Sequence, residues 1–445
     1  MLTPRFFGLA LICPALLLLS AALPALVPVA IVYGGGLIAL AILDRRQAGS
    51  AAQFQIVREH DQKLSLGALN RITLNITSRT DHPISVTVRD EPPDLFVGAD
   101  LATRSGTVGP HETITLEYSI RPLRRGDFVF GNLNARWTGP LRFYTRQAVI
   151  RAAGPVKVYP NLHEIRKYDL LVRRDQLAEM GLRNIRLRGE GTAFESLRDY
   201  TPDDPYRSIN WKATARRGKP ISTDYEPERS QRLIAMLDVG RMMRSPIRVD
   251  DPSGISWNMA KVDFVINSVL LFAYVATLKG DQVGLLVFAD QVQQFIAPAA
   301  GRAHFQKLLD AMYTLGSQPV EADYGRALNY LSVQNKKRSL IVLFTDLSGA
   351  RASESLLLNL PRVAPRHIPL LVTIRDPALD QEAQQRPLDS DAVYRRAVAE
   401  ELIDERRLLL DNLQRRGVLT LDVDAEKLTM AVVNRYLQLK ARMLA

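Results

Sequence analysis

Two aspartates stand where they could hold a cation. Asp238 ends the apolar run 233–238, and Asp346 ends the run 340–346. Both runs are typical of buried strands, and in an α/β sheet the carboxyl ends of the strands form the edge where ligands bind. Carboxylates suit a hard cation, but magnesium needs about six oxygen ligands. The alternative is structural, with both carboxylates accepting hydrogen bonds from backbone or arginine groups.

Other catalytic chemistry has little support. The six histidines are scattered, without an HExxH motif, and the single cysteine, Cys13, lies in an apolar stretch. Phosphate-binding loops of the Walker or Rossmann type are absent, because the run Gly34–Gly36 sits inside an apolar segment. We therefore expect a protein that is not an enzyme and needs no cofactor, although a triad assembled only by the fold would leave no motif.

The elements that position the two aspartates alternate along residues 232–445. Apolar runs predict strands, amphipathic stretches predict helices between them, and this alternation is typical of an α/β fold with a doubly wound, mostly parallel sheet. The charged residues of 391–416 allow i to i+4 pairs and indicate a solvated helix face. The predicted strands are 233–238, 283–288, 340–346, 370–374 and 418–423. The predicted helices are 258–279, 302–315, 324–335, 353–360, 391–416 and 425–443.

The N-terminal 46 residues predict an anchor. Positions 6–43 carry no charge, and a single helix of that length would extend about 57 Å against a hydrocarbon core of about 30 Å. We therefore predict two transmembrane helices, 6–23 and 29–43, with a turn between them near Pro24 and Pro28. Arg5, Arg45 and Arg46 favour a cytoplasmic body at the inner membrane. A cleaved signal peptide over about residues 1–22 and an apolar hairpin of a soluble core are the alternatives.

Residues 52–150 predict a separate β unit. Segments 71–77 and 112–118 alternate apolar and polar residues, which is typical of strands with one buried face. Turn residues such as Gly109-Pro110 and Gly139-Pro140 separate such segments, and a β-sandwich of the immunoglobulin-like type is the predicted architecture.

The positive charge of the chain is concentrated in one region. Residues 121–219 hold 21 Lys and Arg against 10 Asp and Glu, a difference of +11 that equals the net charge of the whole chain. Such a field suits an acidic partner, an anionic membrane or nucleic acid, although a solvated arginine-rich surface explains it equally well.

A segment between residues 189 and 217 carries a family resemblance. Its glycine, aromatic, arginine and tryptophan positions resemble the hallmark motif of the domain of unknown function 58 family, and 151–231 is the predicted motif segment. Two positions depart from the family pattern, because Asp203 replaces a glycine and Asn210 an aspartate. A structural ion-pair plate and a docking surface are both compatible with this mixture. The motif residues are Gly191, Phe194, Leu197, Arg198, Tyr200, Asp204, Arg207, Trp211 and Arg216.

The resemblance implies a von Willebrand factor type A-like fold over residues 232–445. In that fold a metal site uses Asp-x-Ser-x-Ser after the first strand, a threonine, and an aspartate after the fourth strand. Asp238 and Asp346 match the acids, whereas Gly240 and Met242 replace the serines. We therefore expect a degenerate site without bound magnesium, in which Arg241 is a candidate to supply the positive charge instead.

The resemblance also implies a role. Relatives are associated with MoxR-type AAA+ ATPases, so we expect a membrane-anchored interaction or scaffold protein that acts with such an ATPase and other envelope proteins in assembly, maturation or stress tolerance. Two alternatives stay open: nucleic-acid binding through residues 121–219, which is the less favoured, and metal-dependent adhesion.

Overall fold

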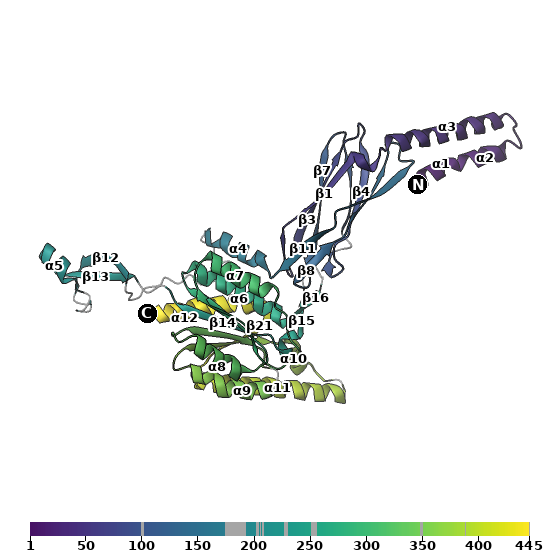
Figure 1. Ribbon diagram of the computed structural model, residues 1–445. Coiled ribbons are helices and arrows are strands. Elements are labelled where there is room, and N and C mark those ends of the chain that lie inside the picture. The colour runs from purple at the N-terminus through teal and green to yellow at the C-terminus, as the bar shows by residue number, and fades with distance from the viewer. Residues whose placement is uncertain are drawn as a thin grey trace. The chain divides into compact units, whose positions relative to one another are not determined.

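The computed structural model describes residues 1–98, 102–173, 193–201, 204, 206, 209–226, 230–250, 256–347, 350–387 and 389–444. It divides into two compact units, Met1–Asn161 and Leu162–Ala445 (Figure 1). Each unit has its own sheets and its own buried core.

Unit 1 begins with an apolar helical hairpin. Helices α1 (Pro4–Ala10) and α2 (Ile12–Leu19) run against α3 (Leu26–Gln47). The turn falls at residues 20–25, and the prediction that the second helix starts at Val29 is wrong by three residues. Pro28 lies in the first turn of α3, where a proline removes no intrahelical hydrogen bond. In length and composition α3 is a candidate membrane span, and only 17% of its most apolar window is buried.

The rest of unit 1 is rich in strands. Alternation in the sequence becomes alternation in burial, since every second residue of β3 is buried. Two sheets have four strands each and a third has three. The first contains β1 (Phe54–His60), β3 (Asn70–Ser78), β7 (Thr113–Pro122) and β5 (Phe96–Val97). The second contains β10 (Thr145–Ile150), β9 (Leu133–Thr138), β4 (Ile84–Asp90) and β6 (Thr103–Val108), and the third β2 (Lys63–Ser65), β11 (Gly154–Tyr159) and β8 (Gly126–Phe130).

Unit 2 is built on a six-stranded sheet of order β18-β17-β14-β19-β20-β21. Five strands are parallel and coincide with the five predicted apolar runs. The sixth, β18 (Val292–Ala299), pairs antiparallel at the edge and was missed by sequence reasoning, because its glutamines and proline lack the apolar pattern of a central strand. The parallel strands are β17 (Gln282–Phe288), β14 (Arg232–Asp238), β19 (Leu340–Thr345), β20 (Ile368–Arg375) and β21 (Leu419–Asp424).

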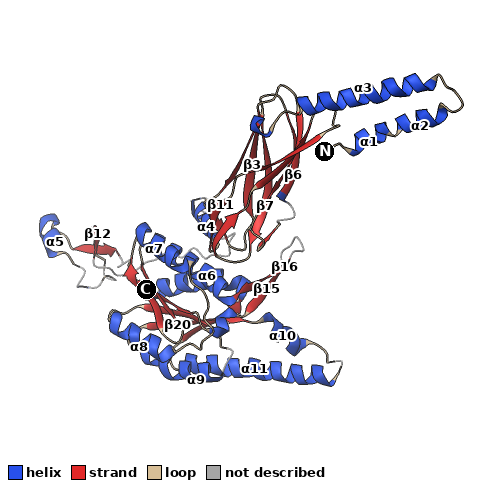
Figure 2. Cartoon of the chain, turned by 45° about the vertical axis from the view of Figure 1, so that its right-hand side comes forward, coloured by secondary structure: helices blue, strands red, loops and turns tan. Residues whose placement is uncertain are grey.

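Helices cover both faces of this sheet (Figure 2). One face carries α6 (Lys261–Leu278), α7 (Arg302–Tyr313) and α12 (Leu428–Leu444). The other carries α8 (Tyr324–Gln334), α9 (Ala350–Asn359) and α11 (Ser390–Arg415), whose apolar side chains form a core with β14, β17, β19 and β20. Helix α6 is apolar enough to pass as a membrane span, but 83% of its apolar window is buried, which identifies it as a core helix.

Shorter elements complete unit 2. A hairpin of β15 (Pro246–Asp250) and β16 (Ser256–Ala260) joins β14 to α6, and α10 (Pro377–Gln384) joins β20 to α11. Two parts of unit 2 precede the six-stranded sheet in the sequence, namely α4 (Leu162–Arg173) and the motif segment. In the motif segment α5 (Trp211–Arg217) connects the paired strands β12 (Ala193–Asp199) and β13 (Ile221–Glu226).

Candidate functional site

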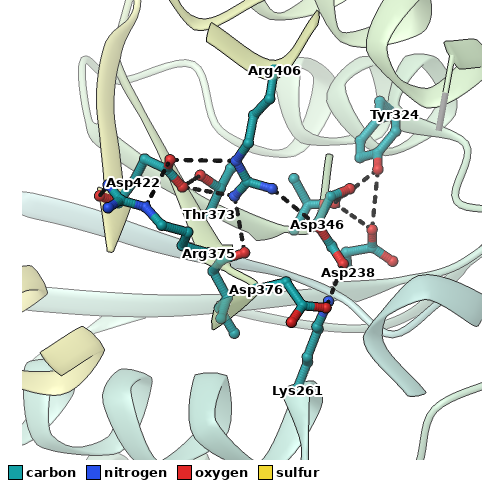
Figure 3. Close-up of polar contacts among 11 residues, drawn as sticks. Asp238, Lys261, Tyr324, Asp346, Thr373, Arg375, Asp376, Arg406 and Asp422 are labelled. Atoms are coloured by element: carbon teal, nitrogen blue, oxygen red, sulfur yellow. Dashed lines mark hydrogen bonds and ion pairs between the residues drawn. The ribbon is translucent and has the colours of Figure 1, made fainter. Parts of the chain in front are cut away.

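The two predicted aspartates meet at the carboxyl edge of the six-stranded sheet. Asp238 is the last residue of β14, and Asp346 directly follows the adjacent parallel strand β19 (Figure 3). Their exposed fractions are 2% and 1%, so neither carboxylate reaches solvent. Because parallel strands end at one edge, residues more than 100 positions apart become neighbours there.

Three hydrogen-bond donors surround Asp238. The Gly240 amide donates to Oδ1 over 2.7 Å, while the hydroxyls of Thr345 and Tyr324 lie 2.6 and 3.1 Å from Oδ2. The Tyr324 and Thr345 oxygens are themselves 2.8 Å apart. Tyr324 opens α8, whose N-cap Asp323 accepts a hydrogen bond from the Arg326 amide. The start of α8 therefore places the Tyr324 hydroxyl beside the end of β14.

Burial dominates the electrostatics of Asp238. It raises the pKa of this carboxyl, an effect partly offset by the hydrogen bonds from Thr345, Gly240 and Tyr324. Burial also raises the pKa of the Tyr324 phenol well above its usual value, and the charge of Asp238 adds to that shift. The hydroxyl groups therefore stay protonated and remain donors at physiological pH.

Asp346 is paired with an internal cation. The Lys261 ammonium lies 2.7 Å from Oδ2 of Asp346, with side-chain exposed fractions of 3% and 0%. Lys261 is the first residue of α6, and the Asp376 carboxylate lies 3.9 Å from its ammonium. An unpaired buried carboxylate is costly, and this lysine supplies the compensating charge.

A second ion pair continues the network toward the edge strand β21. The guanidinium of Arg406, on α11, contacts Asp422 through Nη2 at 2.6 Å and Nε at 3.3 Å, and donates to the Ile374 carbonyl. Its Nη1 lies 3.6 Å from Oδ1 of Asp346. The prediction that the charged residues of 391–416 form a solvated face is therefore wrong for Arg406, whose side chain is only 14% exposed.

The residues of this edge do not fit a divalent cation. Both Asp238 oxygens accept hydrogen bonds, and both Asp346 oxygens face cationic nitrogens. Nor could a serine replace Gly240 freely, since a Cβ there would lie 2.9 Å from the Val320 carbonyl oxygen. Among the described residues no group of three His, Cys, Asp or Glu could hold a metal. Met242 is half-buried in the turn after β14 and offers no oxygen ligand.

The cation at this edge is not the one that sequence reasoning chose. Arg241 points to Glu321, with Nη2 at 3.2 Å from Oε1, and both side chains are 61% exposed. Lys261 takes the role proposed for Arg241. A signal was present, because Lys261 falls in the first turn of the predicted helix 258–279, where the helix dipole disfavours a cation and a nearby anion offsets the cost. Tyr324, Arg406 and Asp422 carried no comparable signal, since their partners come from distant elements.

The family motif lies apart from this network in sequence, and part of it lies outside the described residues. That part comprises Gly191 and Arg207, as well as the side chains of Phe194 and Arg198. Asp204 accepts hydrogen bonds from Thr201, and its carbonyl accepts one from the Tyr200 hydroxyl.

The α5 part of the motif is solvent-exposed. Trp211 is 59% exposed and packs edge-to-face against Tyr206 at 5.6 Å between ring centroids, and Arg216 is exposed as well, as is Leu197 on β12. Asn210, where the family pattern has aspartate, caps α5 by accepting a hydrogen bond from the Ala213 amide. The departure from the pattern therefore keeps the capping function, which either side chain can perform.

These features define a chain with an apolar N-terminal helix, a β-rich unit and an α/β unit whose strand-end acids are satisfied internally. Residues 196–384 match the family model described as "Protein of unknown function DUF58", in agreement with the resemblance carried by the motif. The uncharacterized protein YeaD of Bacillus subtilis (strain 168) is 24% identical over 192 residues, covering 42% of this chain. The chain spans 48% of the length of that relative.

Solved structures give weaker likenesses. The conserved hypothetical protein BatB from Bacteroides thetaiotaomicron matches with a TM-score of 0.32 and 10% identity, covering 48% of this chain and 99% of that one. An uncharacterized membrane spanning protein from Vibrio fischeri matches with a TM-score of 0.19 and 14% identity, covering 47% and 98%. Scores this low carry no argument about function.

Proposed function

We propose that this chain is a membrane-anchored protein that binds other proteins as a scaffold, without catalytic activity or a required cofactor. Protein binding is assigned to the von Willebrand factor type A-like, doubly wound domain that residues 232–445 would form. The strand order, with β18 antiparallel at one edge, supports this assignment. Partners of such sheets are expected at the carboxyl edge.

One observation carries the proposal: the Lys261 ammonium lies against Asp346 where a metal-dependent adhesion domain would need a cation. The positive charge is covalently part of the chain, so the edge keeps its shape without exchange of an ion. A surface that keeps its shape without a bound ion suits a protein that binds its partner continuously. It also argues against metal-dependent adhesion, because a cation would first have to displace the lysine.

The anchor is the hairpin of α1, α2 and α3. The apolar part of α3, residues 26–43, would extend about 27 Å, close to the thickness of a hydrocarbon core. Arg45 and Arg46 follow it after one residue, Asp44, and this supports an inner-membrane protein with both units on the cytoplasmic side.

The partner we propose is a MoxR-type AAA+ ATPase, together with other envelope proteins. This choice rests on the resemblance of the motif segment to the family and not on a contact. It predicts a role in assembly, maturation or stress tolerance of membrane-linked complexes.

Site-specific crosslinking tests the proposal. A photoreactive amino acid replaces Arg241, which is exposed at the carboxyl edge, and, as a control, Arg407, which is similarly exposed on α11 and ion-paired to Asp404. In intact membranes, capture of an AAA+ ATPase from position 241 and not from 407 is expected. Equal capture from both positions, or none from 241, contradicts a dock at this edge.

Nucleic-acid binding is the second candidate. The exposed pair Trp211 and Tyr206 lies beside Lys212, Arg216 and Arg217, which are exposed on α5. Aromatic rings among basic side chains suit single-stranded nucleic acid, whose binding weakens as salt rises. Retention of a labelled oligonucleotide at low salt that is lost in Trp211→Ala would favour this function over the scaffold.

A further inference from the structure

The end of the apolar hairpin is hydrogen-bonded to one loop of the β-rich unit, residues 139–144. Asp44, in the last turn of α3, is fully buried, and its carboxylate accepts hydrogen bonds from the amides of Leu141, Phe143 and Tyr144 at 2.7–2.9 Å. Gly139 makes the approach possible, because a Cβ there would lie 2.4 Å from Oδ1 of Asp44. The loop 139–144 therefore has a fixed position at the base of α3.

The base of the first arm meets the same loop. The Thr3 amide donates to the Phe143 carbonyl over 2.9 Å, and the Thr3 hydroxyl donates to the Arg142 carbonyl over 2.7 Å. Phe6 and Phe143 pack edge-to-face with ring centroids 6.2 Å apart. Both arms of the hairpin and the loop 139–144 thus converge on one junction within unit 1.

This convergence gathers positive charge. Segments 1–7, 43–49 and 139–147 contain five arginines and one acid, Asp44, which gives 5 − 1 = +4. The one acid is already satisfied by three backbone amides. The Arg45 guanidinium lies 5.3 Å above the Tyr144 ring, and Arg146 donates to the Arg45 carbonyl. The arginines are Arg5, Arg45, Arg46, Arg142 and Arg146, of which the first four are exposed.

We propose that this junction binds the headgroups of anionic phospholipids. The inference rests on the membrane anchor of the proposed function, because the arginines lie where the apolar length of α3 ends. Guanidinium groups pair with phosphate oxygens in two-pronged geometry, and a tyrosine such as Tyr144 favours the membrane interface. A surface of net charge +4 is complementary to an anionic bilayer.

The hydrogen bonds of Asp44 hold this basic surface in a fixed arrangement, unlike a flexible basic tail. Arginines from α1, α3 and the loop are held together by backbone hydrogen bonds before any lipid binds. Preorganisation of this kind lowers the entropy lost on binding. The junction should therefore prefer anionic over zwitterionic lipid in the isolated protein as well as in a membrane.

The test uses the full chain in a neutral detergent. Phosphatidylglycerol or phosphatidylcholine is added in steps, and bound lipid is counted by native mass spectrometry alongside the thermal unfolding midpoint. Arg45→Gln, Arg46→Gln and Arg142→Gln are combined in one variant. A control variant of equal charge loss combines Arg71→Gln, Arg79→Gln and Arg89→Gln, which are exposed on β3, after β3 and on β4.

Wild type and control are expected to bind phosphatidylglycerol at least tenfold more tightly than phosphatidylcholine, and the junction variant to lose that preference on the order of tenfold. Equal binding of the two lipids by wild type, or an equal loss in both variants, overturns the proposal. Carbonate extraction of membranes reports the anchor separately. A chain that stays in the membrane but shows no lipid preference contradicts only the headgroup site.

Discussion

The ammonium of Lys261 lies 2.7 Å from Oδ2 of Asp346, and the two side chains are 3% and 0% exposed. The pair joins the start of α6 to the end of β19, and its two residues are 85 positions apart in the sequence. It fixes how a core helix meets the carboxyl edge of the sheet. The site proposed for partner binding therefore depends on one buried charge pair.

Replacing Lys261 by methionine should lower the free energy of unfolding of unit 2 by about 3–5 kcal/mol, because Asp346 would stay buried without the ammonium that lies 2.7 Å from it. Urea unfolding gives the loss, and hydrogen exchange should increase first in α6 and at the end of β19. Lys279→Met is the control, since that lysine is exposed at the other end of the same helix.

A double-mutant cycle separates the pair from other effects. Asp346→Leu combined with Lys261→Met should be less destabilised than the sum of the two single variants, because neither charge is then left unpaired. Strict additivity would contradict a direct interaction.

Magnesium should not stabilise the protein. The carboxylate oxygens of Asp238 and Asp346 are engaged by donors of the chain, so millimolar magnesium is expected to leave the unfolding midpoint unchanged and to give no heat in calorimetry. Lys261→Ala removes this cation from Asp346, but its midpoint should also be insensitive to magnesium, because Asp238 keeps its three hydrogen-bond donors and Asp346 still faces Arg406. Binding of magnesium by wild type with octahedral geometry would overturn the assignment of Lys261.

The pH dependence of stability should contain a contribution from Asp238. Its pKa is raised in the folded state from an ordinary value of 3.8, mainly by burial, so the folded chain holds this proton more tightly than the unfolded chain. The contribution is greatest below 3.8 and declines as pH rises toward the raised pKa. Asp238→Asn cannot ionise, and its destabilisation relative to wild type should therefore shrink between acidic and neutral pH in parallel unfolding series. A constant difference would contradict the raised pKa.

Arg406 should not tolerate lysine. Its guanidinium contacts both oxygens of Asp422 and the Ile374 carbonyl, and an ammonium cannot reproduce this fork. Arg406→Lys is expected to cost about 1–3 kcal/mol and to increase hydrogen exchange in β21. Arg407→Lys, at an exposed neighbouring position, should change neither measurement.

Asn210 should matter as a helix cap. Asn210→Ala removes the acceptor for the Ala213 amide and is expected to destabilise α5 by about 1 kcal/mol, whereas Asn210→Asp should retain the cap. Local hydrogen exchange at residues 211–217 distinguishes the two variants. Equal exchange in both would assign the family pattern at this position to something other than capping.

The sequence by itself determined most of the elements. Apolar runs were long enough to define the five parallel strands, and the alternation in residues 71–77 defined the face of β3 that is buried. The uncharged stretch 6–43 defined a hairpin, although its turn was misplaced because Pro28 fits inside the first turn of a helix. The edge strand β18 was not predicted from the sequence, since a strand at the edge of a sheet needs no apolar pattern.

Only the tertiary structure decided the chemistry of the edge. The sequence placed Asp238 and Asp346 at strand ends, but three cationic residues, Arg241, Lys261 and Arg406, were available to neutralise them. Charge is visible in a sequence, whereas burial and direction are set by packing: Arg241 turns to solvent and Glu321, while Lys261 is enclosed at the start of α6. A buried carboxylate pairs with whichever cationic side chain the fold places beside it, and the sequence alone does not specify which side chain that is.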